Sequence, residues 1–524
     1  MTNTMFQSVG LRDLLAGLAR EADVPDLQVT AVRDDSRAVE PGDVFVALGG
    51  SKADGHKFIS HALSRGAKVV VSDAKGAERD ALSAEIAQHG AAFVGVADAR
   101  VALGHMLARG FGVVEKLRLL AVTGTNGKTT ITYLVEAILK AAGKSPGVFG
   151  TVEYRFANHA EPAPLTTPGS TMLHQWLCRM SDAGCTDVVL EASSHALAQD
   201  RLAGCLFDVA ALTNVTQDHL DYHGTMEAYF DAKARLFVDY LAPTGVGVVF
   251  VDRADGLQMA KRLLDHGRAS LKLSVAQEHA EAADIWVSDR RLDGQGMVAT
   301  FHTPKGVVEV HCKLVGDYNL ANVATAFGMA YAHGISLEAI AAGVASLPGV
   351  PGRLEPVANN EGVLCVVDYA HTPDALERAM GALRPLTQGR LITVFGCGGD
   401  RDPGKRPLMG AAVAQLADIG VVTSDNPRTE DPTKILTMVA VGLRSSNKVE
   451  REPRDLGLGG FCVQEDRRSA IALAVNLAQK GDVLLIAGKG HEDYQIIGTQ
   501  KQHFDDREVA AAAFAARAGT KGAS

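Results

Sequence analysis

The stretch LLAVTGTNGKTTITYLVEAILKAAG, residues 119–143, has a lysine inside a glycine-bearing turn. Residues 119–123 predict a short buried strand, and the apolar residues after the turn recur at helical spacing: Ile131, Leu134, Val135, Ile138 and Leu139. Strand, glycine turn and helix therefore follow one another. In this order of elements, the N–H groups of the turn and of the helix start point at a bound anion.

Four residues of the turn supply the parts of a phosphate site: Gly124, Gly127, Lys128 and Thr129. The lysine brings a positive charge to the phosphates, and the hydroxyl beside it can hold Mg²⁺. The general P-loop pattern G-x-x-x-x-G-K-[ST] is not met in full, because Val122 stands at its first glycine. An ordinary surface turn is the alternative. We predict phosphate binding, because strand, turn and helix all agree with the context that the motif requires.

Length and composition limit the class of protein. A chain of 524 residues is too long for one ordinary core, so roughly two to four domains are expected. The formal net charge is −9 and no long run of lysine and arginine occurs, which argues against nucleic-acid binding and favours small-molecule ligands.

Cysteine usage and the N-terminus bear on location. The seven cysteines show neither CxxC spacing nor a paired framework, which is typical of reduced thiols. The first residues, MTNTMFQSVG, lack the basic and apolar regions of a secretory leader, and no apolar run reaches the length of about 18 residues that spans a membrane. The sequence predicts a cytoplasmic protein without membrane insertion.

Three blocks of strand and helix patterns lead us to expect three α/β domains, at residues 1–112, 113–347 and 348–524. In the second and third blocks, apolar strands end in polar residues, as in TDVVLEASSH and RLITVFGCGGDRD. This pattern is typical of doubly wound, mostly parallel sheets, whose ligands lie at the carboxyl ends of the strands. We expect a small N-terminal domain, a central P-loop domain and a Rossmann-like C-terminal domain. The Pro/Gly segment 348–352 marks a boundary and a hinge.

Further motifs succeed one another along the chain: EASSHAL, NVTQDHLDYHGTMEAYFDAKARLF, GDYNLANVATA, PGRLE, DYAHTPDAL, GGDRDPGKRPLMG, DNPR and GKGHEDYQ. Together with TGTNGKTT they resemble, in this order, the motifs of the Mur ligase family. The resemblance extends from about residue 30 to residue 508. It implies ATP-dependent amide bond synthesis through an acyl phosphate, and the DNPR element implies that meso-diaminopimelate is joined to UDP-MurNAc-L-Ala-D-Glu in peptidoglycan biosynthesis.

The resemblance also assigns roles around ATP and Mg²⁺. Lys128 and His219 are expected to be catalytic, Thr129, Glu191 and a carbamylated Lys233 to hold Mg²⁺, and Asn322 and His371 to lie near the nucleotide. The expected ATP-binding residues are Gly124, Thr125, Asn126, Gly127, Lys128, Thr129, Thr130, Asn319, Arg353 and Asp368.

Taken alone, several of these residues have simpler interpretations. Glu191 could be a solvated strand end, Lys233 a solvated helix face, and the asparagine and aspartate motifs could stabilise helix starts. His219 and His223, four residues apart, could suggest a zinc pair, but a third ligand is not evident.

Two further sets of residues are carried over from the family. The set for UDP-MurNAc-dipeptide is Ser36, Ser51, Lys52, Ala53, Thr166, Thr167, Ser193, Gln199 and Arg201, although Leu165 stands where some relatives have asparagine. The set for diaminopimelate is Arg401, Asp425, Asn426, Pro427, Arg428, Gly488 and Glu492. Arginine suits the far carboxylate of diaminopimelate, because its guanidinium makes two parallel hydrogen bonds. Loop serines and threonines, and the DNPR segment itself, could instead be turn formers.

Other functions remain open from the sequence. Relatives that add L-lysine or a dipeptide, and folylpolyglutamate synthetase, are the nearest enzymes. A nucleotide-binding regulator without chemistry would predict the loss of Glu191, Lys233 or the charges of the third block, all of which are present.

Overall fold

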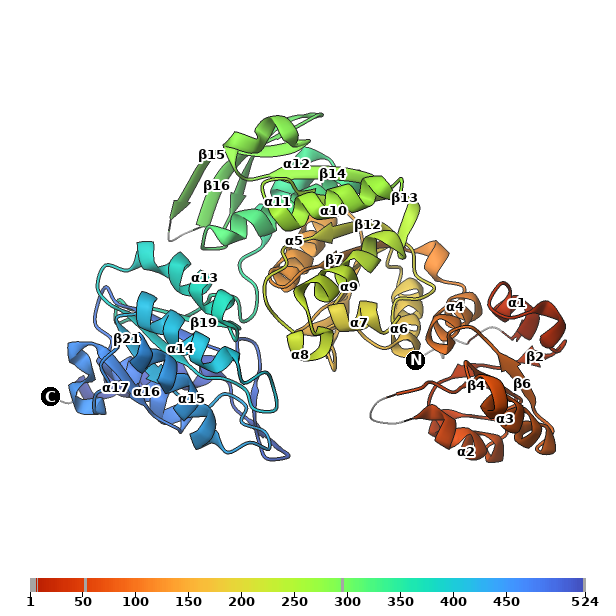
Figure 1. Ribbon diagram of the computed structural model, residues 1–524. Coiled ribbons are helices and arrows are strands. Elements are labelled where there is room, and N and C mark those ends of the chain that lie inside the picture. The colour runs from red at the N-terminus through yellow and green to blue at the C-terminus, as the bar shows by residue number, and fades with distance from the viewer. Residues whose placement is uncertain (1–5, 7, 51–53, 294–295, 522–524) are drawn as a thin grey trace.

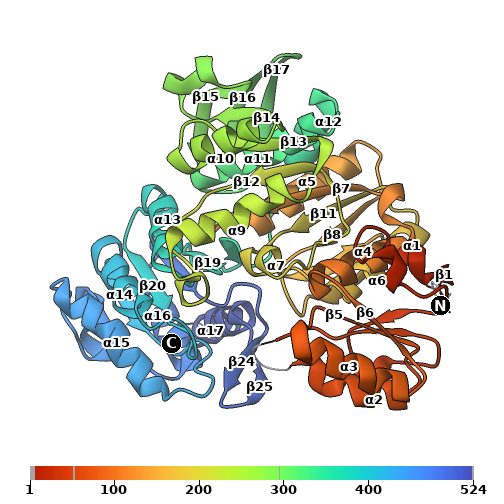
Figure 2. The same cartoon turned by 45° about the vertical axis from the view of Figure 1, so that its right-hand side comes forward.

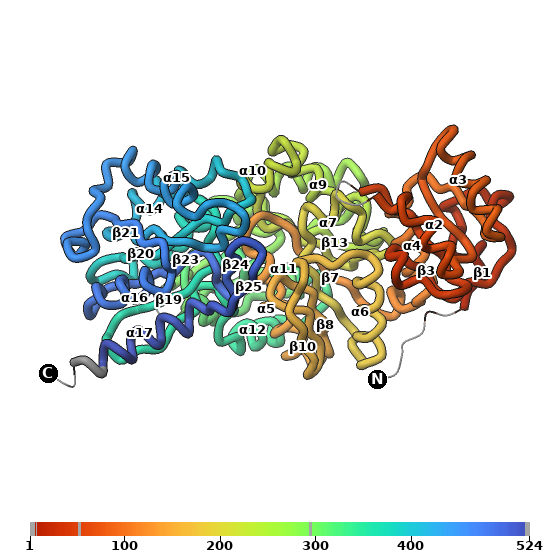
Figure 3. Tube along the Cα trace, turned by 90° about the horizontal axis from the view of Figure 1, so that it is seen from below, coloured from red at the N-terminus to blue at the C-terminus, as the bar shows by residue number. Residues whose placement is uncertain are grey.

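The computed structural model describes residues 6, 8–50, 54–293 and 296–521, so the expected ligands Ser51, Lys52 and Ala53 lie outside the described residues. Three main sheets, of four, eleven and six strands, follow one another along the chain in an α/β architecture (Figure 1). Seen from below, the three parts built on these sheets lie in a row, with the central one in the middle (Figure 3). Among the described residues, no helix combines the length and the apolar character needed to cross a bilayer.

The N-terminal sheet is small and parallel. Its strands, in spatial order, are β3 (Val32–Arg33), β4 (Val44–Val46), β5 (Val69–Ser72) and β6 (Ala92–Gly95). An antiparallel pair, β1 (Val9–Gly10) and β2 (Gln28–Val29), lies apart from it. The helices are α1 (Leu11–Leu15), α2 (Ile59–Ser64), α3 (Gly76–Gln88) and α4 (Ala99–Phe111).

Helix α4 joins this part to the central one. A Cβ atom at its Gly104 would come within 2.3 Å of the carbonyl oxygen of Ala203, so the glycine permits close contact with the loop after α7 (Ser194–Ala198). Leu103 and Met106 of α4 share one buried hydrophobic cluster with Leu177 and Leu202 of the central part. The N-terminal part is therefore packed firmly against the centre.

The central sheet has eleven strands. In spatial order they are β10 (His159–Pro162), β9 (Glu153–Phe156), β8 (Pro146–Phe149), β11 (Asp187–Glu191), β7 (Arg118–Thr123), β12 (Phe207–Leu212), β13 (Leu241–Phe250), β14 (Ala269–Ser274), β15 (Ile285–Asp293), β16 (Gly296–Thr303) and β17 (Gly306–Cys312). The strands from β8 to β15 are parallel, and both edges continue as antiparallel strands. In Figure 2 the β15–β17 extension projects at the top of the molecule. Neither antiparallel edge was predicted from the sequence.

Helices cover both faces of this sheet. The central helices, besides α7, are α5 (Lys128–Ala141), α6 (Ser170–Asp182), α8 (Leu220–His223), α9 (Met226–Val238), α10 (Ala254–Asp265), α11 (Tyr318–Ala332) and α12 (Leu337–Ser346). Leu119 and Ala121 of β7 join the cluster under α6 and α9, whereas Leu120 and Val122 join the cluster under α5, α11 and α12. This alternation explains the continuous apolar run at 119–122, because a strand buried on both faces has no polar side.

The C-terminal sheet has the order β18 (Glu355–Val357), β19 (Leu364–Asp368), β23 (Val483–Ala487), β20 (Leu391–Phe395), β21 (Ile419–Val422) and β22 (Gly460–Val463), parallel except for β18. A hairpin, β24 (Tyr494–Ile497) and β25 (Gln500–His503), follows it. Its helices are α13 (Pro373–Leu383), α14 (Lys405–Leu416), α15 (Pro432–Ser445), α16 (Arg467–Leu477) and α17 (Asp506–Lys521). The predicted α/β class with a mostly parallel central sheet is confirmed.

Candidate active site

The loop at residues 124–127 connects β7 to α5, as predicted. Gly127 has a φ of +90° and caps α5, and Gly124 has a φ of +146°. A Cβ atom at Gly124 would lie 1.8 Å from Thr213 Oγ1, and one at Gly127 would lie 2.3 Å from Asn322 Oδ1. Both glycines are therefore required by backbone conformation and by space.

Lys128 folds back over the loop. Its Nζ donates to the carbonyl oxygens of Gly124 at 2.8 Å and Thr125 at 2.9 Å. Desolvation lowers the pKa of Lys128, and the charges of Glu191 and Asp218 oppose that effect. The ammonium group thus lies within the turn whose N–H groups can receive phosphate.

A cavity of about 280 Å³ opens in front of this loop. The predicted residues that line it are Thr125, Asn126, Gly127, Lys128, Thr129, Thr130, Thr166, Glu191, Ser193, His219, Asn322, Arg353, Asp368 and His371. Gly124 and Asn319 are not among the lining residues, and Asn319 Oδ1 accepts a hydrogen bond from Asn322 Nδ2 at 2.8 Å. The lining also includes Phe250, Arg253 and Arg378, which the sequence analysis did not select because they lie outside its motifs.

Glu191, at the end of β11, is fully buried beside the loop. It accepts hydrogen bonds from Thr129 Oγ1 at 3.2 Å, Thr151 Oγ1 at 2.8 Å and the Thr151 N–H at 2.9 Å. Arg353 Nη2 donates to Thr129 Oγ1 at 3.1 Å. A carboxylate and two hydroxyls at one point form an all-oxygen set of the kind that Mg²⁺ prefers.

Lys233 on α9 is buried, with 1% of the residue exposed, which differs from a solvated helix face. Its Nζ donates to the Gly124 carbonyl oxygen at 2.9 Å, the atom that also accepts from Lys128, and lies 4.2 Å from the centre of the Tyr229 ring. Burial, together with the charge of Lys128, holds the pKa of Lys233 well below its usual value. This environment favours the neutral form of the amine.

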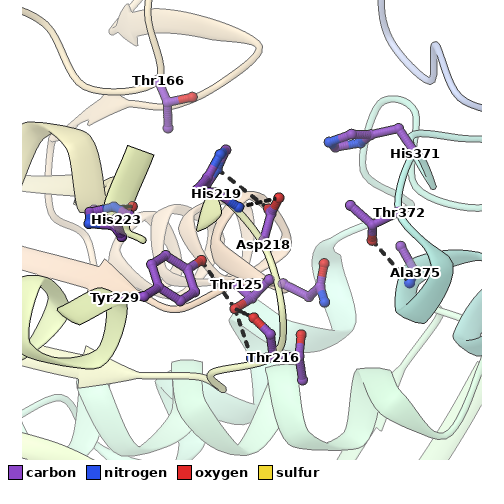
Figure 4. Close-up of polar contacts among 12 residues, drawn as sticks. Thr125, Thr166, Thr216, Asp218, His219, His223, Tyr229, His371, Thr372 and Ala375 are labelled. Atoms are coloured by element: carbon purple, nitrogen blue, oxygen red, sulfur yellow. Dashed lines mark hydrogen bonds and ion pairs between the residues drawn. The ribbon is translucent and has the colours of Figure 1, made fainter. Parts of the chain in front are cut away.

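His219 lies where the central and C-terminal parts meet. It has a φ of +53°, and its Nε2 is 3.4 Å from Asp218 Oδ2. Burial lowers the pKa of His219 to about 4, against the opposing charge of Asp218. Figure 4 shows His371 and Thr372 opposite this pair, and the hydrogen bond of the Tyr229 hydroxyl with Thr125 Oγ1, 3.2 Å long.

The alternative of a zinc site at His219 and His223 would need a third ligand close to both histidines. The His223 Nε2 is 3.0 Å from the Ser194 hydroxyl. The His195 ring makes edge contacts with His219 and His223, with ring centres 4.8 and 5.6 Å away. In the part of the chain that the structure describes, no group of three or more His, Cys, Asp or Glu side chains is placed to hold a metal ion.

A second cavity, of about 680 Å³, continues from the first and lies between the central and C-terminal parts. Asp218, His219, Tyr369 and His371 line both cavities. The second brings together predicted residues of two substrate sets: Thr166, Thr167, Ser193, Arg201, Arg401, Asp425, Asn426, Arg428, Gly488 and Glu492.

Three predicted residues lie off this cavity. Gln199 holds Arg201 instead, since its Oε1 accepts from Arg201 Nη2 at 2.7 Å. Pro427 shapes the turn before Arg428. Ser36, in the N-terminal part, has its Oγ 3.0 Å from His61 Nδ1.

The C-terminal half of the second cavity is rich in charge. Asn426 Nδ2 donates to Glu492 Oε2 at 2.8 Å, and Arg428 Nη1 donates to the Gly399 carbonyl oxygen at 2.7 Å. Burial and the nearby Asp425 raise the pKa of Glu492. Two basic residues that were not predicted from the sequence lie directly beneath this part of the cavity: Lys489 and Arg467. Lys489 is completely buried and Arg467 almost completely.

The C-terminal part also touches the phosphate loop. Asp374, in the first turn of α13, accepts hydrogen bonds from Asn126 Nδ2 at 2.7 Å and from Thr216 Oγ1 at 3.3 Å. Residues more than 240 positions apart thus meet at the edge of the first cavity. Each cavity therefore depends on both parts for its walls.

Family models match three successive stretches of the chain. The model described as "Mur ligase family, catalytic domain" matches residues 28–111, "Mur ligase middle domain" matches 122–330, and "Mur ligase, glutamate ligase domain" matches 352–490.

Similar proteins and structures agree with these models. The UDP-N-acetylmuramoyl-L-alanyl-D-glutamate--2,6-diaminopimelate ligases of Geobacter metallireducens and Trichormus variabilis are 43% and 42% identical to this chain, covering 93% and 97% of it and 94% and 99% of their own lengths. A solved structure of a ligase with the same name has a TM-score of 0.69 at 35% identity, over 98% of this chain and all of that one. A MurF ligase from Thermotoga maritima in complex with ADP, 19% identical, shares the fold with a TM-score of 0.61 over 94% of this chain and 98% of its own. The chain belongs to the Mur ligase family.

Proposed function

We propose that this protein uses ATP to join the γ-carboxylate of D-glutamate in UDP-MurNAc-L-Ala-D-Glu to an amino group of meso-diaminopimelate, in peptidoglycan biosynthesis. The observation that carries the proposal is the continuity of the two cavities. One begins at a phosphate loop, the other ends at a pocket with Arg428, Asn426 and Glu492, and they share His219 and His371. The names of the similar ligases support the same substrates.

The first cavity is the proposed ATP site. Lys128 and the N–H groups of the loop and of α5 would bind the β- and γ-phosphates. Thr129 and Glu191 would hold Mg²⁺, which neutralises phosphate charge when bound. Arg353 contacts Thr129 from the C-terminal part, so it can bring a second positive charge to the transferred phosphoryl group.

The reaction takes place where the cavities meet. A γ-carboxylate oxygen of D-glutamate attacks the γ-phosphorus of ATP, the bond to ADP breaks, and an acyl phosphate forms. The amine then attacks the acyl carbon, phosphate leaves with the C–O bonding electrons, and the amine loses a proton. Positioning and charge neutralisation carry most of such a reaction. His219 is neutral at neutral pH, since its pKa is about 4, so it can accept a hydrogen bond there.

Lys233 is the proposed site of carbamylation. A neutral amine adds to CO₂ and releases a proton, which turns a cationic side chain into an anionic one. The fold favours this, because the Nζ atoms of Lys128 and Lys233 both contact the Gly124 carbonyl oxygen, and a second ammonium would be repelled. The carbamate would then serve as a ligand for Mg²⁺.

The remaining assignments are also proposals. Thr166, Thr167, Ser193 and Arg201 would hold the muramoyl-dipeptide, and the N-terminal part, with Ser36, would hold the uridine end. We propose domains at residues 1–112, 113–347 and 348–524, with closure of the third about the segment 348–352. We propose a cytoplasmic location, because all seven cysteines are free and the reaction consumes ATP.

One experiment separates this function from its rivals. The purified protein is incubated with ATP, Mg²⁺, UDP-MurNAc-L-Ala-D-Glu and one candidate amine at a time, and phosphate release is measured together with the mass of the product. Diaminopimelate should give the highest kcat/KM, above L-lysine and D-alanyl-D-alanine. A preference for lysine or for the dipeptide, or no release with any amine, would reject the proposal.

A further inference from the structure

Lys489 is a lysine without exposed side-chain surface, directly beside the proposed amino-acid cleft. This cleft is the C-terminal half of the second cavity, and Gly488 and Glu492 line it. It lies in the turn after β23, next to Gly488. Its Nζ is 3.3 Å from Asn426 Oδ1, 3.4 Å from Glu492 Oε2 and 4.0 Å from Asp425 Oδ1. A lysine is almost never fully buried unless it is paired, so these neighbours balance its charge.

Two carboxylates face this one lysine. Asp425 and Glu492 come from the ends of different strands, β21 and β23, and both line the cavity. Asn426 joins them, because its Nδ2 donates to Glu492 at 2.8 Å while its Oδ1 accepts from the Ile496 N–H at 2.9 Å. Asp425 Oδ1 is buried and has no hydrogen-bond partner among the described residues, so Lys489 Nζ, 4.0 Å away, offsets its charge without a hydrogen bond.

The other large cation beneath the cleft is already balanced. Arg467, at the start of α16, makes two hydrogen bonds to Asp506, of 2.8 and 2.6 Å, and neither side chain is exposed. Arg467 Nη2 also donates to the Ala487 carbonyl oxygen at 3.0 Å. The Arg467–Asp506 pair therefore supports the strand end below Gly488 without adding net charge to the cleft.

We propose that Lys489 is a positioning residue that sets the charge of the amino-acid cleft, so that Asp425 and Glu492 together present one negative charge for one ammonium group of the incoming amino acid. This inference rests on the proposed function. With Lys489 the three groups sum to one negative charge, which matches one ammonium. Without it, two carboxylates share a buried site and Glu492 takes up a proton, since like charges in such a site do not both ionise readily. The total charge stays at one negative, but Glu492 no longer faces the ammonium group as a carboxylate.

The charge state of Glu492 gives the inference a pH signature. The ionisable groups that face it are Asp425 after β21, Lys489 in its own turn, Arg467 on α16, Tyr369 after β19 and Tyr494 on β24. Burial and Asp425 raise the pKa of Glu492, whereas Lys489 and Asn426 hold it down. Removal of Lys489 raises this pKa further. The carboxylate then binds an ammonium group only at higher pH.

The test is Lys489→Met, which keeps the bulk of the side chain and removes its charge. We expect the KM for diaminopimelate to rise about tenfold or more at neutral pH and to fall again as the pH is raised, over a more alkaline range than in the wild type. The KM for ATP and kcat at saturating amino acid should change less than about threefold. The matched control is Lys448→Met, a partly buried lysine after α15, which should leave the pH profile of KM unchanged.

A second pair of variants tests the same charge balance from the side of Glu492, and its single variant keeps Lys489 in place if Lys489→Met does not fold. Glu492→Gln alone leaves Asp425 against Lys489, with no net charge, and should bind the amino acid weakly at every pH. The double variant Lys489→Met/Glu492→Gln restores one negative charge and should bind more tightly than Glu492→Gln.

Two results would overturn the inference: a KM profile of Lys489→Met that is parallel to that of the wild type, or a double variant no better than Glu492→Gln. The proposed function is judged separately, by whether the wild type uses diaminopimelate at all.

Discussion

Replacing Arg428 by alanine tests whether this side chain recognises the far carboxylate of diaminopimelate. Arg428 follows β21 and lines the second cavity, where its Nη1 is held by the Gly399 carbonyl oxygen at 2.7 Å. A guanidinium in this position can make two parallel hydrogen bonds to a carboxylate. Losing one partner of such a charge pair costs on the order of 2–5 kcal/mol, so kcat/KM for diaminopimelate should fall by roughly thirtyfold or more.

The backbone of Arg428 does not confound this variant. Its φ is +52°, a left-handed conformation that is costly for any residue with a Cβ atom. Alanine keeps the Cβ atom, so the strain is the same before and after the change. The backbone N–H of Arg428 donates to the Ile496 carbonyl oxygen at 3.1 Å, and its own carbonyl oxygen accepts from Gly498 at 2.7 Å. Both hydrogen bonds are made by the backbone, so the substitution keeps them. A fall in kcat/KM for diaminopimelate can therefore be attributed to the loss of the guanidinium.

The assay compares two amino acids in the wild type, in two Arg428 variants and in one control variant. The kcat/KM values for diaminopimelate and L-lysine are measured in the wild type, in Arg428→Ala and in Arg428→Lys. L-Lysine lacks the far carboxylate, so it should be a poor substrate for the wild type. Its kcat/KM should fall much less than that of diaminopimelate in Arg428→Ala. Arg428→Lys keeps a positive charge but lacks the planar guanidinium. Its kcat/KM for diaminopimelate should lie between the values of the wild type and of Arg428→Ala. Arg444→Ala, on the exposed side of α15, serves as the control. Equal losses for both amino acids, or a wild type that prefers lysine, would refute the reasoning.

Three further predictions concern other parts of the molecule. Lys128→Ala should abolish ATP turnover with an unchanged circular dichroism spectrum, because it removes a charge from the phosphate loop; near-normal phosphate release would reject the P-loop assignment. Lys233→Ala should be nearly inactive and partly rescued by short-chain carboxylates, and full activity without additive would exclude a required carbamate. Burial opposes the charge of Asp187, but hydrogen bonds from His333, Thr186 and Lys144 outweigh it and lower the pKa to about 2. Because this pKa lies below its unfolded value, Asp187→Asn should lower the free energy of unfolding, measured in urea, by about 2 kcal/mol at neutral pH. The difference between wild type and variant should become smaller as the pH falls from about 4 to about 2. A difference that stays constant with pH would contradict the assignment.

The fold could be predicted where the chain repeats a local pattern. The run at 119–123 and the spacing of Ile131, Leu134 and Ile138 identified β7 and α5 correctly. The antiparallel strands β9, β10, β16 and β17 were missed, because they extend the edges of a sheet whose register is set by distant strands. Lys489 and Arg467 were missed for a related reason. A lysine or arginine has no sequence signal for burial, since its burial depends on a carboxylate that tertiary packing brings alongside.

The phosphate loop shows why an incomplete motif can still identify the correct turn. Val122, which stands at the first glycine of the general pattern, is fully buried as part of β7, so its side chain supports the sheet and does not enter the turn. The sharp change of direction falls at Gly124, where a side chain would collide with Thr213, and at Gly127, where it would collide with Asn322. Both neighbours come from other elements, the end of β12 and α11. The spacing of glycines in such a loop is therefore set by what packs against it, and the order of strand, turn and helix is the more dependable signal.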